Sequence, residues 1–201
     1  MDKTKIKKVE NYLFWHCKRR YDAASAMSGI LGVIINLKPC CCCVLNETNL
    51  RKIDLTRLRK ILAKLDLKLS FERKLSNDGG ILSLYVSKNI KKSERLKELF
   101  NSLESYNYGD AARKDINAEI GTLLGYPQTA INYYVRYVES GNLSESHKER
   151  VKKYFYYAHS DTYQNKEYKE YDERLNRALE KYSPRSAKVI RKKYPNKRWL
   201  D

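Results

Sequence analysis

The stretch that most constrains the fold is residues 116–138, INAEIGTLLGYPQTAINYYVRYV, in which two short helical patterns meet at a break. Apolar side chains recur at helical spacing on both sides of it, at Ile116, Ile120, Leu123 and Leu124 and then at Ile131, Tyr134, Val135 and Val138. In the break, Gly125 can take the left-handed conformation that ends a helix, and Pro127 suits the first turn of the next helix. We therefore expect two amphipathic helices that share one core and cross at a steep angle, because the turn between them is short.

The spacing in this corner resembles that of a DNA-binding helix-turn-helix, with Gly121 four residues before the turn glycine and Ile131 six residues after it. The pair then spans residues 112–139, and its second helix directs a polar side outward, made of Gln128, Thr129, Asn132, Tyr133 and Arg136. Gln and Asn can form two hydrogen bonds with adenine, and Arg can do so with guanine or hold a phosphate. The same pattern also fits an αα-corner that only packs a helical domain, and the sequence leaves both interpretations open.

Positive charge is concentrated at the two ends of the chain. The net charge is +17, and residues 1–20 contain seven Lys or Arg against two acids, while residues 181–201 contain eight against one. The last group includes Lys192, Lys193 and Arg198, which we expect to grip phosphates. Clustered cations release counterions when they meet a phosphate backbone, so the charge favours a polyanionic partner. Solubility alone is the competing explanation.

The N-terminal half predicts helices followed by a small sheet. Residues 3–20 have the pattern of a basic amphipathic helix, in which Tyr12, Phe14 and Trp15 are expected to pack against the rest of the domain. A more apolar helix follows over residues 21–36. Next come a buried strand at residues 40–45, a helix capped by Asp54, and a β-hairpin over residues 67–86, which together make a β-α-β-β unit.

The C-terminal half predicts only helices, beginning with one capped by Ser93. After the corner, a helix is expected after Ser144 or Ser146, another over residues 168–182, and a last one from Ser183-Pro184. The fold class is therefore α+β, with a three-stranded sheet, N-terminal helices and a mostly helical C-terminal half. Regions 1–90 and 91–201 are expected to form one compact domain.

Four consecutive cysteines, Cys40, Cys41, Cys42 and Cys43, lie on the predicted first strand. Alternation along a strand points Cys40 and Cys42 to one face and Cys41 and Cys43 to the other, whereas a tetrahedral zinc site needs ligands that converge from one side. Ordinary buried side chains are the simpler interpretation. A thiol or metal site completed from elsewhere, for example by Cys17, stays open as an alternative function.

No catalytic motif is present: the sequence contains no glycine-rich phosphate loop, nucleophile elbow or His-Glu metal motif. His159-Ser160-Asp161 has the residue types of a triad, but adjacent side chains point apart. Seventeen tyrosines are interleaved with lysines, most densely over residues 154–171, where Tyr157 and Tyr163 are the candidates for exposed base stackers. We therefore expect no enzyme activity and no cofactor.

No signal peptide or membrane span is expected, because the Lys-rich start leads into a polar amphipathic pattern and the apolar stretch at residues 23–37 is short and interrupted. These features predict a cytoplasmic protein that does not associate with a membrane.

The motif Leu124-Gly125-Tyr126-Pro127, the surroundings of His159, and Leu37-Lys38-Pro39 resemble an uncharacterised family of archaeal and bacterial proteins of unknown function. Members look like Leu-Gly-Tyr-Pro followed by an acidic residue and paired cysteines, and later a His with two spaced cysteines before a Tyr-rich helix. In this chain Thr129 and Ala130 stand where the paired cysteines would be. The resemblance covers about residues 25–180, and it implies no activity, because none is established for the family.

Taken together, these observations predict a non-enzymatic protein that binds DNA or RNA through the helical pair and the basic ends. An interaction module whose basic ends dock an acidic protein is a further alternative. The oligomeric state is open, and a homodimer is one option.

Overall fold

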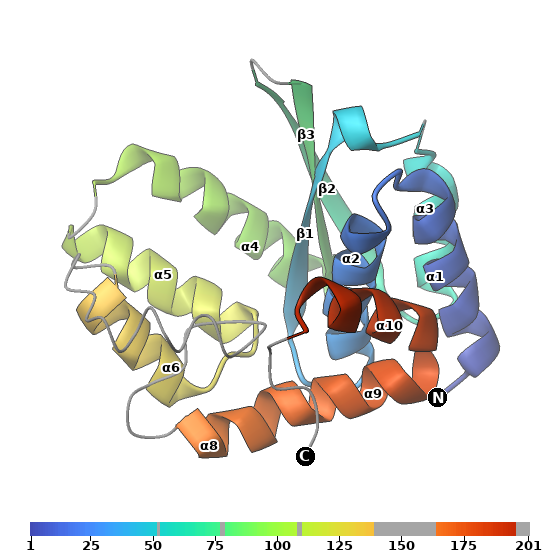
Figure 1. Ribbon diagram of the computed structural model, residues 1–201. Coiled ribbons are helices and arrows are strands. Elements are labelled where there is room, and N and C mark those ends of the chain that lie inside the picture. The colour runs from blue at the N-terminus through green and yellow to red at the C-terminus, as the bar shows by residue number, and fades with distance from the viewer. Residues whose placement is uncertain (52, 77–78, 108–109, 139–163, 196–201) are drawn as a thin grey trace.

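A three-stranded antiparallel sheet lies in the middle of the molecule, as the computed structural model shows in Figure 1. The structure describes residues 1–195 except 52, 77–78, 108–109 and 139–163. The strands are β1 (Cys40–Asn46), β2 (Lys68–Ser76) and β3 (Gly79–Ser87), and their order in the sheet is β1-β3-β2. The central strand β3 pairs with both neighbours along its length, so that Val86 lies opposite Cys41 on one side and Leu69 on the other.

One face of the sheet is covered by the N-terminal helices α1 (Lys3–His16), α2 (Arg20–Ile34) and α3 (Leu55–Ala63). The side chains that alternate toward this face belong to one large core, together with the apolar residues of the helices. They are Cys41, Cys43, Leu45, Leu69, Leu82, Leu84 and Val86. A short 3-10 turn, η1 (Glu47–Asn49), joins β1 to the segment that leads into α3.

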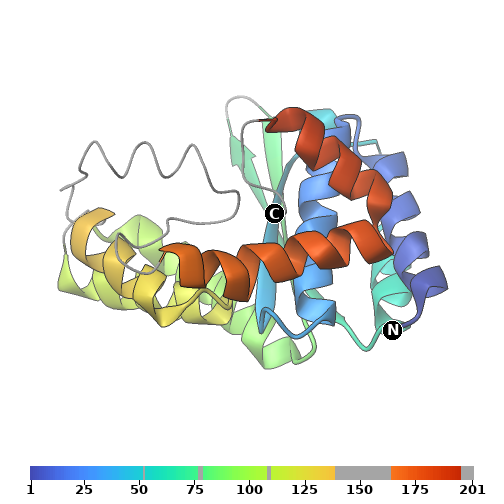
Figure 2. The same cartoon turned by 60° about the horizontal axis from the view of Figure 1, so that its bottom comes forward.

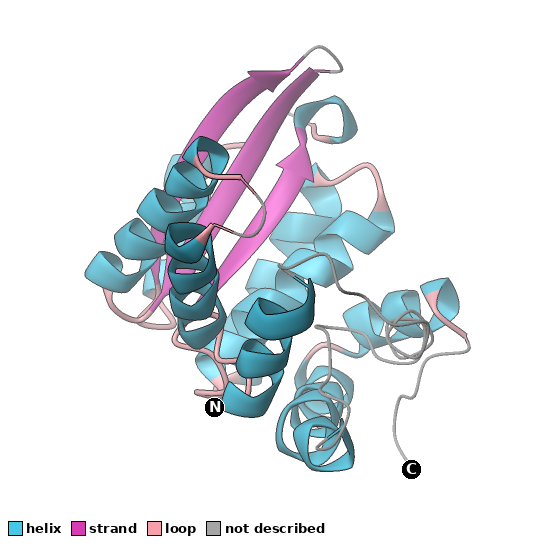
Figure 3. Ribbon diagram, turned by 90° about the vertical axis from the view of Figure 1, so that its left-hand side faces the viewer, coloured by secondary structure: helices cyan, strands magenta, loops and turns pink. Residues whose placement is uncertain are grey.

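The other face is covered by α4 (Ile90–Ser102), followed by the 3-10 turn η2 (Leu103–Ser105) and by α5 (Ala111–Leu123) and α6 (Gln128–Tyr133). A π-helical segment, η3 (Tyr134–Val138), continues α6. The buried residues on this side form a separate and smaller cluster of Cys40, Tyr85, Leu96, Leu99 and Ile120. Figure 3 looks onto this face of the sheet, with the three strands side by side and helices in front of and behind them.

The C-terminal helices connect the two sides. The segments α8 (Gln164–Glu167), η4 (Tyr168–Glu173) and α9 (Arg174–Tyr182) follow one another as a long rod, which begins beside α6 and reaches α1 and α2 (Figure 2). The last helix, α10 (Pro184–Lys193), packs along α2. Tyr171, Leu175, Leu179 and Ile190 from these helices are buried in the same core as α1 and α2. Residues from both predicted regions, 1–90 and 91–201, therefore share one core.

The predicted α+β class, the three-stranded sheet and the β-α-β-β order are confirmed. Two predicted boundaries were wrong. The first helix ends at His16 rather than at residue 20, because Cys17 pairs with Leu50 in an isolated β-bridge and the Lys18 amide donates to the Asn49 carbonyl instead of continuing the helix. Helix α4 begins at Ile90, capped by Asn89, and Ser93 lies inside it with its hydroxyl donating to the Ile90 carbonyl.

The expected helix after Ser144 or Ser146 lies outside the described residues. So do Tyr157, Tyr163, His159 and Arg198.

Candidate nucleic-acid interface

The turn between α5 and α6 closes as a Schellman motif. The Gly125 amide donates to the Thr122 carbonyl at 3.0 Å, and the Tyr126 amide donates to the Gly121 carbonyl at 3.0 Å. Gly125 has a φ of +74°, which confirms the predicted left-handed conformation. A Cβ at this position would lie 2.4 Å from the Leu37 carbonyl oxygen, so the turn also packs directly against the backbone before β1.

Helices α5 and α6 approach closely at Gly121. A Cβ on this glycine would lie 2.8 Å from Cγ1 of Ile131, which is 5% exposed. The glycine spacing noticed in the sequence therefore has a physical reason, because it lets the second helix sit against the first. This contact holds for a DNA-reading pair and for a plain packing corner alike.

The outward side of α6 is narrower than predicted. Gln128 and Asn132 of α6 and Arg136 of η3 are exposed and follow one another at four-residue spacing, so they form a single stripe that runs from α6 into η3. We call it the exposed stripe of α6. The Gln128 Nε2 donates to the Asn132 Oδ1 at 2.8 Å. Among the described residues, the side-chain oxygen of Gln128 and the side-chain nitrogen of Asn132 have no hydrogen-bond partner and can bind a ligand.

Tyr133 was expected to face outward, and this was wrong: it is 7% exposed. Thr129 is half-buried, and its hydroxyl donates to the Glu167 carboxylate at 2.5 Å. The reason is that α6 packs on two sides, against α5 through Ile131 and against α8 through Thr129. A prediction from helical periodicity assumes that only one side of the helix is buried, so it overestimates how many residues face the solvent.

The two basic ends of the chain meet in the fold. Helix α10 lies along α2, and the Tyr194 hydroxyl is 3.0 Å from the Tyr21 hydroxyl, with the two rings edge to face at 5.7 Å. The Lys193 Nζ lies 4.6 Å from the centre of the Tyr21 ring. We call the resulting patch the terminal basic surface, defined by the exposed residues Lys18, Arg19, Arg20, Lys188, Lys192 and Lys193.

A buried carboxylate fixes α10 in this position. Glu10 of α1 is 5% exposed, and its Oε1 accepts hydrogen bonds from the Ser186 amide at 3.0 Å and from the Ser183 and Ser186 hydroxyls. A carboxylate at a helix N-terminus satisfies amides that have no partner inside the helix. The contact joins residues that are 176 positions apart in the chain. It holds α10, which carries the C-terminal lysines, in place beside α2.

The cysteines of β1 alternate between the two cores, as predicted. Cys41 and Cys43 belong to the large core, and Cys40 with Cys42 belongs to the smaller one. Burial raises the pKa of Cys40 to about 11 and that of Cys42 to about 12, and a hydrogen bond with Cys43 raises the pKa of Cys41. Within the described ranges, no three His, Cys, Asp or Glu side chains lie together as metal ligands would. The thiols in this structure pack as small side chains in the two cores.

Two motifs that are far apart in the sequence meet beside the corner, and sequence reasoning did not connect them. The Lys38 Nζ lies 5.9 Å from the centre of the Tyr126 ring and 5.4 Å from that of Tyr171, and the two rings are 5.7 Å apart. Burial raises the pKa of both tyrosines, so their hydroxyls stay protonated. The sequence did offer one indication of this contact, because it contains both the motif Leu37-Lys38-Pro39 and the motif Leu124-Gly125-Tyr126-Pro127.

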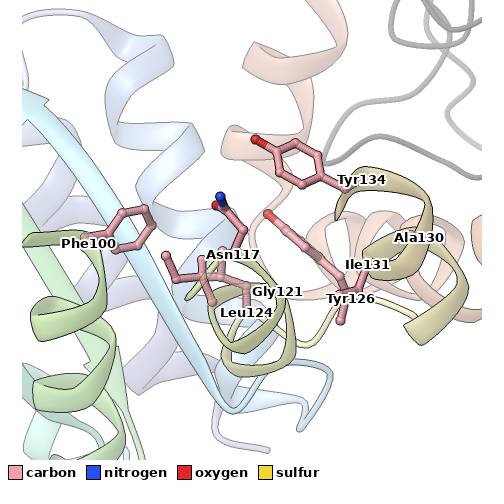
Figure 4. Close-up of a pocket in the computed structure, with 9 residues that line it drawn as sticks. Phe100, Asn117, Gly121, Leu124, Tyr126, Ala130, Ile131 and Tyr134 are labelled. Carbon is pink, nitrogen blue, oxygen red and sulfur yellow. The ribbon is translucent and has the colours of Figure 1, made fainter. Parts of the chain in front are cut away.

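A cavity of about 290 Å³ opens between α4, α5 and α6 (Figure 4). Its wall is mostly apolar, from Phe100, Ile120, Leu124 and Ile131, and Asn117, Tyr126 and Tyr134 contribute polar atoms. The cavity lies behind the exposed stripe of α6 rather than beside it, because Ala130 and Tyr134, which line it, lie on the opposite side of the helix.

A second missed feature is Trp15, which was expected to pack against the domain. That expectation was wrong, because Trp15 is 67% exposed, whereas Tyr12 and Phe14 are buried. Trp15 follows Lys8 and Asn11 at seven- and four-residue spacing, and both of these are exposed. The shared polar stripe was therefore the signal that placed Trp15 in solvent.

No protein-family profile matches the chain, and no curated protein or solved structure is detectably similar to it. The resemblance at Leu124-Gly125-Tyr126-Pro127 stays a prediction. None of the helices in the described part of the chain is both long and apolar enough to span a bilayer.

Proposed function

We propose that this protein binds nucleic acid without catalysing a reaction, with the terminal basic surface holding the phosphate backbone and the exposed stripe of α6 contacting bases. The observation that carries the proposal is the convergence of the two basic ends. Charges that the sequence separates by more than 160 residues are brought close together, because α10 packs along α2 and Lys193 lies over the ring of Tyr21, next to Arg20. A concentrated patch of this kind attracts a polyanion more strongly than the same charge spread over the molecule.

The charge near α6 is more balanced than that of the terminal basic surface. Lys166 lies 3.8 Å from the Glu170 carboxylate, and Arg177 pairs with Glu173, so part of the positive charge of α8 and α9 is neutralised locally. Phosphate contacts position a protein on its target, whereas base contacts specify the sequence. We therefore assign affinity to the terminal basic surface and selectivity to Gln128, Asn132 and Arg136.

Affinity for duplex DNA and for RNA, measured across a salt series, tests the proposal. Binding should weaken steeply as salt rises, since each neutralised phosphate contributes a slope of about 0.7 to 0.9 in log affinity against log salt. The Lys192→Gln, Lys193→Gln double variant should lower this slope by about 1.4 to 1.8. The matched control is Lys91→Gln, Lys92→Gln, which removes the same charge from adjacent exposed lysines on α4.

Two results would end the proposal: no binding at low salt, or equal effects of the two double variants. The role of α6 has a separate test in the sequences selected from a random pool. Asn132→Ala should relax the selected preference and leave the salt slope unchanged. Thr122→Ala, an exposed position on neighbouring α5, serves as its control.

A further inference from the structure

Beside the start of the terminal basic surface, α1 and α3 enclose an open groove of about 610 Å³. Aromatic rings and cations alternate along its wall, which includes Lys8, Asn11, Tyr12, Trp15, His16 and Arg57. The Tyr12 and His16 rings lie 4.3 Å apart, and the Arg57 guanidinium lies 6.0 Å from the centre of the Tyr12 ring. We call this feature the Trp15 groove.

A further cation reaches the groove from a different segment. The Arg51 guanidinium lies 5.3 Å from the centre of the Trp15 ring. Its backbone is held in place, because the Arg51 amide donates to the His16 carbonyl at 2.7 Å and the neighbouring residues Cys17 and Leu50 form a β-bridge. The indole is therefore largely exposed and lies next to a guanidinium whose backbone is held by hydrogen bonds.

The groove is also anchored from α3. The Tyr12 hydroxyl donates to the Asp54 carbonyl at 2.6 Å, and the Asp54 carboxylate accepts from the Arg57 amide at 2.9 Å, which caps α3. The nearby carboxylate is thus used in capping the helix. Within the described residues, the His16 Nδ1 is buried without a hydrogen-bond partner. The groove therefore combines an exposed indole with three cations.

We propose that the Trp15 groove binds unpaired nucleotides of a single-stranded nucleic acid, with a base stacked on the Trp15 indole and the adjacent phosphates held by Lys8, Arg51 and Arg57. Stacking needs an exposed aromatic face, and a base in a duplex has no free face to offer. Lys18, Arg19 and Arg20 follow Trp15 within five residues, so the strand can continue onto the terminal basic surface. The inference rests on the proposed function for the choice of nucleic acid as the ligand, but it assigns the binding to different residues.

Charge and burial argue against a lipid surface as the occupant. A helix that lies on a membrane inserts its apolar side. In α1 that side is already covered, because Ile6, Val9 and Leu13 are each 0% exposed in the core. A single indole among cations and polar groups offers little to a bilayer and suits a base with its phosphate.

The test uses the intrinsic fluorescence of Trp15. The chain has two tryptophans, so a Trp199→Phe background leaves Trp15 as the reporter. A short oligothymidylate should quench this fluorescence in low salt, and a blunt duplex of the same length should quench it much less. Trp15→Ala should weaken oligothymidylate binding by about 5- to 150-fold, and Trp15→Tyr should retain much of it. Tyr106→Ala, at an exposed aromatic residue on another part of the surface, is the matched control.

Unchanged oligothymidylate affinity in Trp15→Ala, with the fold verified by circular dichroism, would overturn the inference. A blue shift of Trp15 with anionic phospholipid vesicles and no response to the oligonucleotide would overturn it in favour of a membrane role. Oligothymidylate binding that depends on Lys192 and Lys193 but not on Trp15 would overturn the inference and leave the proposed function standing. Quenching of Trp15 that survives Lys192→Gln, Lys193→Gln supports the groove and counts against the terminal basic surface.

Discussion

The two faces of the sheet are covered in different ways. On the face that bears Cys41 and Cys43, helices from both ends of the chain close on one large core, and side chains such as Leu31 are 0% exposed. On the face that bears Cys40 and Cys42, the core is small, Ile116, Leu123 and Leu124 stay half-buried, and Leu124 lines the cavity. The two candidate binding regions therefore differ in their support. The terminal basic surface and the Trp15 groove lie on the face with the large core, whereas the α5–α6 corner lies on the face with the small core.

The strongest test of this comparison is a pair of truncations in the two cores. Leu31→Ala should lower the free energy of unfolding by about 3 to 5 kcal/mol, because a closely packed site collapses little around the space left behind. Leu99→Ala should cost nearer to 2 kcal/mol, since half-buried neighbours can move into the gap. Urea denaturation of both variants measures the two values. Equal costs would mean that the smaller cluster is packed as rigidly as the large one.

The corner offers a second and smaller contrast. Gly125→Ala combines a positive φ with a backbone atom 2.4 Å from the new Cβ, and strain of this kind costs about 1 to 3 kcal/mol. Gly121→Ala places its Cβ against the Ile131 side chain, which can shift, and alanine gains about 0.5 to 1 kcal/mol of helix preference. Thermal unfolding should therefore rank Gly125→Ala as the less stable variant. The opposite order would show that the α5–α6 contact, rather than the turn, holds the corner in place.

The smallest effect appears only at alkaline pH. The pKa values of Cys40 and Cys42 are raised by burial from 9.0 to about 11 and about 12, so the folded protein keeps thiol protons that the unfolded chain releases. This contribution to stability is complete below about pH 9 and is lost as the pH rises through 11 to 12. Unfolding free energies measured from pH 8 upward should fall less steeply in Cys42→Ala than in the unsubstituted protein. If the two proteins lose stability with pH at the same rate, water reaches the Cys42 thiol on the face with the small core.

Much of the secondary structure was predictable because it depends on local patterns. Alternation fixed the faces of the cysteine strand, and the glycine with its following proline located the turn of the corner. Element ends were less predictable when a distant segment set them. Helix α1 stops at His16 because Leu50 pairs with Cys17, and no pattern within residues 3–20 contains that information.

The candidate site divides in the same way. Gln128, Asn132 and Arg136 lie outward as their spacing predicts, because a four-residue period is a property of the helix itself. Tyr133 and Thr129 depend on which neighbours pack against α6, and α8 comes from a part of the chain more than thirty residues away. The contact between Lys38, Tyr126 and Tyr171 likewise joins three segments that only folding brings together.

The sequence by itself determined the α+β class, the excess of positive charge and the residue types that can bind a polyanion, because these follow from composition and short-range periodicity. Tertiary structure alone decided that the two basic ends form one surface, that Arg51 lies beside Trp15, and that one predicted reader of bases is buried. The physical reason is that exposure and proximity depend on which segments exclude water from one another. In this protein those segments come from opposite ends of the chain, joined by the buried Glu10 carboxylate and its two serines.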